Sequence, residues 1–99
     1  MSYQEKITAA RRLAILLALY FAPGYTMNRA ALKMQVEATG YVASNDLFYA
    51  ELAWLDEVGL IEFSQPIAKL TDRGADVALG KSQTPGVRRP SPGETDGPQ

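Results

Sequence analysis

Apolar residues recur at helical spacing near the start of the chain and predict a first helix from about residue 4 to residue 21. Pro23 and Gly24 end it, because neither residue readily continues a helix. One face of this helix carries Ile7, Ala10, Ala14, Leu17, Ala18 and Phe21, and the remaining circumference carries Leu13, Ile15, Leu16, Leu19 and Tyr20. A helix that is apolar on every side has more surface to bury than one small core offers. We therefore expect a homodimer with Leu16, Leu19 and Tyr20 in its interface; the alternative is that other helices of the same chain wrap this helix on two sides.

Two shorter helices are predicted next. Asn28 is a suitable N-cap for a helix that runs to about residue 39, and residues 25–27 before it favour a short strand. Residues 40–44 form a turn, and Ser44 then caps a third helix over residues 45–58. Its inner arc holds Phe48, Leu52 and Leu55, with Leu47, Trp54 and Val58 on the adjoining edge, and its outer arc holds Asn45, Asp46, Tyr49, Ala50, Ala53, Asp56 and Glu57.

The pattern after the third helix predicts a hairpin and a last helix. Gly59 is typical of a helix end, and residues 60–63 alternate as a strand does. The hairpin turns at residues 64–66, which carry no charge, and returns to Leu70. Thr71 then caps a final helix that ends at Gly80.

Two motifs carry a resemblance to a known family. Leu52-Ala-Trp-Leu-Asp-Glu-Val-Gly-Leu-Ile61 and Leu70-Thr-Asp-Arg-Gly74 resemble the second half of a winged helix-turn-helix domain, where they close the recognition helix, open the wing and close it again. The resemblance covers roughly residues 7–80. It implies a mainly α fold with a small β-hairpin: a three-helix core, a short wing and a C-terminal helix.

The same resemblance implies a DNA-binding face. Arg29 and Lys33 lie at the start of the second helix, the end that faces a DNA phosphate in many helix-turn-helix proteins. Exposed cations at a helix start are also ordinary solubilising residues. The first turns of the recognition helix, which face the DNA groove in the family, correspond to Ser44, Asn45 and Tyr49. The wing carries Gln65 and Lys69. The wing tip departs from the family pattern, because it lacks the Arg or Lys that commonly enters the minor groove.

Charge is distributed unevenly, although the net value is only −1. Residues 1–33 carry five cations against Glu5, whereas residues 34–68 contain no Lys or Arg and six acids. The end of the chain, residues 81–99, is rich in Pro and Gly and nearly devoid of apolar residues. Such a segment buries too little apolar surface to compensate for the conformational entropy that it would lose on ordering. We therefore expect one domain over residues 1–80 and a disordered tail over residues 81–99.

Several classes of function are disfavoured by what the chain lacks. Without Cys or His it has no thiol nucleophile, no common zinc site and no usual proton shuttle, and its acids lack a calcium-loop spacing. We therefore expect no enzyme activity, no metal and no cofactor. The longest apolar run is about ten residues, half of a bilayer span, and the first residues lack the basic start of a signal peptide. These features predict a cytoplasmic protein that does not bind membranes.

Two functions remain open. The fold resemblance favours a small dimeric regulator or accessory factor that binds double-stranded DNA, of the kind found in bacteria and their phages. The charge map favours a winged-helix module that binds a protein through the acidic outer arc of the third helix and the apolar edge at Leu47 and Trp54. The sequence prediction is DNA binding, with protein binding as the alternative.

Overall fold

The computed structural model describes residues 2–96. Three of its helices begin directly after the N-cap residues that the sequence predicts. Asn28, Ser44 and Thr71 each accept a hydrogen bond from a backbone N–H of the first turn that follows, as predicted, and Ser2 does the same for the first helix. The elements are α1 (Tyr3–Tyr20), β1 (Thr26–Asn28), α2 (Arg29–Ala38), α3 (Asn45–Glu57), β2 (Ile61–Ser64), β3 (Ile67–Leu70) and α4 (Asp72–Ala78), with short 3-10 turns at Pro23–Tyr25 and Glu94–Asp96.

The three strands form one antiparallel sheet in the order β1-β3-β2. Lys69 of β3 lies opposite Thr26 on one side and opposite Glu62 on the other. The predicted pairing of a short strand near residue 26 with the hairpin is therefore confirmed. The fold is mixed α/β, with four helices and a small three-stranded sheet, in an arrangement compatible with a winged helix.

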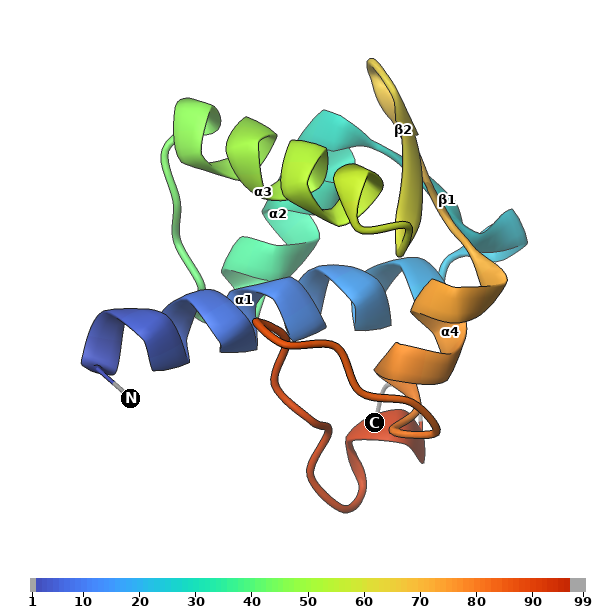
Figure 1. The fold of residues 1–99 in the computed structure, drawn as a ribbon. Coiled ribbons are helices and arrows are strands. Elements are labelled where there is room, and N and C mark those ends of the chain that lie inside the picture. The colour runs from blue at the N-terminus through green and yellow to red at the C-terminus, as the bar shows by residue number, and fades with distance from the viewer. Residues whose placement is uncertain (1, 97–99) are drawn as a thin grey trace.

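Helix α1 lies at the centre of the molecule, with α2 and α3 on one side and the C-terminal residues on the other (Figure 1). It packs against α2, α4 and β3, while α3 packs against β2. Leu16 and Leu19 are completely buried in this single-chain core. They cannot form the dimer interface that we predicted, because the chain itself covers that side of α1. Tyr20 is half-buried, and its ring packs edge-on against Phe21 at 5.1 Å. A dimer through another face of α1 stays a prediction.

The C-terminal segment, residues 81–96, runs back along α1 (Figure 1). The Arg88 backbone N–H donates to the Ala9 carbonyl over 3.1 Å, Thr84 is buried, and Val87 packs against the core. This packed path replaces the disorder that we expected for these residues. The segment has few apolar side chains of its own, but it covers part of the surface of α1 and Trp54, which its composition does not reveal. Residues 97–99, also part of the predicted tail, lie outside the described residues.

Removing residues 82–99 should lower the thermal midpoint. The deletion uncovers Trp54 and α1, and loss of that burial should cost about 1–2 kcal/mol. Trp54 is the only tryptophan, so its fluorescence reports the change directly. We expect a red-shifted emission together with the lower midpoint. A milder variant, Gly86→Ala, should move both in the same direction, because an added Cβ would lie 3.2 Å from the Trp54 ring. An unchanged midpoint and emission in both variants would show that the segment does not pack.

Candidate interaction surface

Most of the predicted site residues that are exposed side by side lie on the outer side of α3. Phe48, Leu52 and Leu55 point into the core, as the periodicity predicted. The opposite side, here called the α3 face, consists of exposed residues only: Asn45, Asp46, Tyr49, Ala50, Ala53, Asp56 and Glu57. Among residues 2–96, none of its three carboxylates has an ion-pair partner. The α3 face is thus negatively charged and unneutralised.

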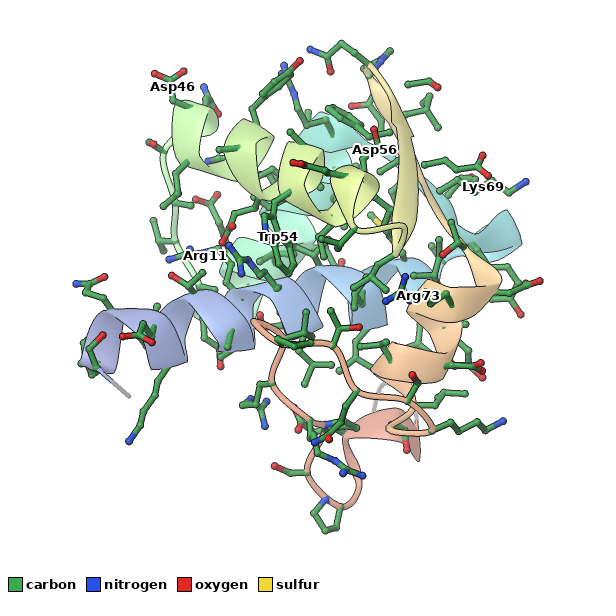
Figure 2. All side chains as sticks on the ribbon, in the orientation of Figure 1. Arg11, Asp46, Trp54, Asp56, Lys69 and Arg73 are labelled. Atoms are coloured by element: carbon green, nitrogen blue, oxygen red, sulfur yellow. The ribbon has the colours of Figure 1, made fainter. Side chains whose placement is uncertain are left out.

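No cation belongs to this face, and two cations of other elements, Lys33 and Arg73, already contact other groups. The Lys33 Nζ lies 3.0 Å from the Glu37 carboxylate one turn along α2. Lys69 is exposed on β3 with Glu62 opposite it in register, at the other side of the molecule from Asp46 (Figure 2). Arg73 donates a hydrogen bond of 3.2 Å to the Val58 carbonyl just after α3. Only Lys33 of these three cations is neutralised by an ion pair, and among residues 2–96 none of them is ion-paired with the α3 face.

The residues predicted to contact DNA on α3 and at the hairpin turn are exposed, and one of them, Ser44, also caps α3. Asn45, Tyr49 and Gln65 are exposed, and the Tyr49 ring packs edge-on against Phe63 of β2 at 5.6 Å, which joins α3 to the hairpin. Ser44 uses its hydroxyl to accept the Leu47 N–H as the N-cap of α3.

Arg29 starts α2 beside the hairpin. Its backbone N–H donates to the Pro66 carbonyl over 2.7 Å, and its side chain is half-buried. Of the seven predicted DNA-contact residues, five are exposed: Ser44, Asn45, Tyr49, Gln65 and Lys69. Only Lys69 among these five carries a positive charge.

The two apolar α3 residues predicted for a protein interface, Leu47 and Trp54, differ in accessibility. Leu47 is exposed at the edge of α3. Trp54 faces α1 (Figure 2), where the Arg12 guanidinium stacks 3.7 Å from its ring centroid and the backbone of Gly86 approaches it. Trp54 is therefore held against the first helix and does not form the open apolar edge that we predicted for a protein interface.

An ion cluster between α1 and α3 was not anticipated from the sequence. The Glu51 carboxylate lies 2.9 Å from Arg11 NH1 and 3.0 Å from Arg12 Nε, and Arg11 and Glu51 are only 6% and 3% exposed. Arg12 also donates to the Gly86 carbonyl over 3.2 Å, so the cluster fastens both α3 and the C-terminal segment to α1. The helical spacing of α3 could have indicated this cluster. It places Glu51 on the inner side with Phe48, Leu52 and Leu55, and a buried charge requires a partner.

A groove of about 670 Å³ opens on a different side of α1. Its α1 side is the apolar face formed by Ala10, Ala14, Leu17, Ala18 and Phe21. Arg88 and Glu94 of the C-terminal segment also line it, joined by an ion pair of 2.8 Å. Their hydrogen bond is the main reason why the pKa of the Arg88 guanidinium is raised. Burial alone would raise the pKa of the Glu94 carboxyl, but hydrogen bonds from Arg88 and Ser91 outweigh burial and lower it.

This ion pair predicts a pH dependence of the C-terminal segment. Because the Glu94 pKa is lowered on folding, its stabilisation is complete above about pH 4.5, the ordinary value, and is lost as the pH falls through the lowered pKa. Glu94→Gln should therefore have a lower thermal midpoint than the wild type at neutral pH, and the difference should vanish in acid. Glu57→Gln, which changes an exposed carboxylate without an ion pair, is the control. A wild-type to Glu94→Gln difference that stays constant from neutral pH into acid would contradict this assignment.

Clusters of metal-ligating side chains and membrane-spanning helices are both absent from residues 2–96. No group of three or more carboxylates there could hold a metal ion. No helix in that range is long and apolar enough to cross a bilayer.

Comparisons with known proteins add relatives but no activity. No protein-family model matches the chain, and no solved structure matches it. It is 33% identical over 90 residues to an uncharacterized protein of Escherichia phage Mu, gp26, with 87% of this chain and 93% of gp26 covered. It is also 33% identical over 78 residues to an uncharacterized protein of Haemophilus influenzae, with 74% of this chain and 76% of that protein covered. Both relatives agree with the expected bacterial or phage setting. The extent of the first match shows that the chain belongs to the protein family of phage Mu gp26.

Proposed function

We propose that the chain is a winged-helix protein that works through protein contacts, docking the α3 face on a positively charged surface of a partner protein. The order of helices, the position of the hairpin after α3 and the capping at Thr71 support the winged-helix assignment. The observation that carries the function is the charge of the α3 face. In this fold α3 is the element that would enter a DNA groove, and here it presents Asp46, Asp56 and Glu57 and no cation.

Electrostatics disfavour DNA on this face. Duplex DNA carries about one negative charge per 1.7 Å of axis, and non-specific affinity comes from Lys and Arg that replace its counterions. The three carboxylates of the α3 face would be repelled by this charge. Lys33 is already paired with Glu37, and Lys69 lies on the hairpin, at the other side of the molecule from Asp46 (Figure 2).

The same face has the composition of a protein-docking surface. Between its carboxylates lie Tyr49, Ala50 and Ala53, and exposed Leu47 adjoins them. Tyrosine is a frequent interface anchor, and Tyr49 is held in place by Phe63. Carboxylates around such an anchor attract and orient a basic partner.

DNA binding is the second candidate, because Asn45 and Tyr49 are exposed one turn apart on α3 and Arg29 lies beside the turn of the hairpin. In that case the protein would be a regulator or accessory DNA-binding factor, with phosphate contacts from Arg29 and Lys33.

A duplex-binding assay separates the two candidates. We expect the wild type not to bind a mixed-sequence DNA duplex measurably even near about 50 mM salt. Reversing three charges together, with Asp46→Lys, Asp56→Lys and Glu57→Lys, should create salt-sensitive binding. Wild-type binding that falls steeply with salt, and that Arg29→Glu with Lys33→Glu removes, would overturn the proposal in favour of DNA.

Protein contact is tested by photo-crosslinking in host cells. A photoreactive amino acid at exposed Ala53 should give protein adducts, and Asp56→Lys should remove them. The same amino acid at Ser82, exposed in the C-terminal segment, is the positional control. Equal adducts at both positions, or none at Ala53, would contradict docking through the α3 face.

A further inference from the structure

The groove on α1 has the size and shape of a small-molecule site. Its volume of about 670 Å³ falls within the range of ligand pockets, about 300–1,000 Å³. From Ala10 to Phe21 its α1 side is about 16 Å long, as the helical rise gives. Three alanines, Ala10, Ala14 and Ala18, line this side together with Leu17 and Phe21. An elongated apolar molecule would bury most of its surface along this side.

Arg88 supplies a cation at one end of the groove. It is anchored there because its backbone N–H donates to the Ala9 carbonyl, next to Ala10. A guanidinium has five N–H donors, and three hydrogen bonds leave this group within the described residues, to the Arg89 carbonyl, Ser91 Oγ and Glu94 Oε2. The phenol of Tyr41, which also lines the groove, interacts with the same guanidinium and, after Glu94, helps to raise its pKa. With Tyr41 counted as a fourth acceptor, one N–H donor of Arg88 remains for a ligand.

We propose that this groove binds a small amphipathic carboxylate, with its aliphatic or aromatic part along α1 and its carboxylate hydrogen-bonded to Arg88. Charge complementarity selects this class of ligand, because within residues 2–96 Arg88 is the only cation that lines the groove, and the α1 side of the groove is apolar. Charge-assisted bonds from arginine to carboxylate are about twice as strong as neutral ones. An uncharged amphiphile would gain the apolar contact alone. No residue of α3 lines the groove, so this site does not depend on the function proposed for the α3 face.

The ligand and Glu94 use the same guanidinium. The Glu94 carboxylate already neutralises much of the Arg88 charge at 2.8 Å. Replacing it by Gln should therefore strengthen binding of a carboxylate ligand. Replacing Arg88 should have the opposite effect. This pair of opposite changes is specific to an anion held by Arg88.

Calorimetric titration of the full chain with decanoate, below its micelle concentration, tests the proposal. We expect saturable binding by the wild type and binding at least about tenfold weaker for 1-decanol, which has the chain but not the charge. Arg88→Gln should weaken decanoate binding about tenfold, and Glu94→Gln should strengthen it. Arg89→Gln is the matched control, since Arg89 is exposed in the same segment and does not line the groove.

Equal binding of decanoate and 1-decanol by the wild type would overturn the proposal, whatever the variants do to folding. Absence of decanoate binding would overturn it as well. So would equal losses in Arg88→Gln and Arg89→Gln. If sedimentation shows a dimer that Ala14→Glu dissociates while decanoate has no effect on it, the groove is covered by a second copy of the chain and not by an acid.

Discussion

Glu51→Gln should destabilise the protein by about 3–5 kcal/mol, the usual cost of removing one partner from a buried ion pair. The neutral amide cannot compensate two guanidinium groups, and Arg11 has no other ion-pair partner within residues 2–96. Arg11 would remain with a charge in a place where only 6% of its surface is exposed. In a domain of this size the loss lowers the thermal midpoint by roughly 15 °C or more. Urea and thermal unfolding of the purified variant measure both quantities.

Two comparisons show whether the charge is the cause. Glu57→Gln makes the same chemical change on the exposed side of α3 and should alter stability by less than about 0.5 kcal/mol. Arg11→Met combined with Glu51→Leu removes the buried charge together with its partner, while Arg12 keeps its stack on Trp54. This double variant should be more stable than Glu51→Gln. A double variant as unstable as the sum of its single changes would show that the three residues do not act as a unit.

Local features of the fold could be predicted from the sequence, because their causes lie within a few residues. Asn28, Ser44 and Thr71 satisfy N–H groups in the turn that follows them, so each helix start is determined locally. Gly59 adopts a φ of +84°, which explains why the chain can leave α3 there and enter β2. The orientation of α3 followed from its own periodicity.

Features that depend on distant segments could not be predicted in the same way. The pattern of α1 showed that it is apolar all round, but not whether Leu16 and Leu19 are covered by the same chain or by another. The C-terminal segment is ordered by the Ala9 carbonyl and by Trp54, far away in the sequence. The groove with Arg88 at its end results from that same long-range packing, so the composition of residues 81–99 did not reveal it.

Gly74→Ala should also destabilise the protein, by about 3 kcal/mol, although alanine normally favours a helix by about 1 kcal/mol over glycine. Gly74 lies within α4 and is buried where the helix crosses the start of the hairpin. A Cβ at this position would overlap the Leu60 carbonyl oxygen and lie 2.8 Å from Leu70 Cδ1. The Leu60 carbonyl cannot easily move, because it accepts the Thr71 N–H over 3.2 Å. Either α4 or the hairpin must shift.

Gly40→Ala separates this overlap from the general effect of replacing a glycine. Gly40 has a φ of +103° and no atom within 4 Å of an added Cβ, so its replacement costs only backbone strain, about 1–2 kcal/mol. Urea unfolding should therefore rank the proteins as wild type, Gly40→Ala and Gly74→Ala, in order of decreasing stability. A Gly74→Ala variant as stable as the wild type would mean that α4 can move away from the sheet without loss. In that case the close approach of α4 to Leu60 would not be the reason why position 74 requires glycine.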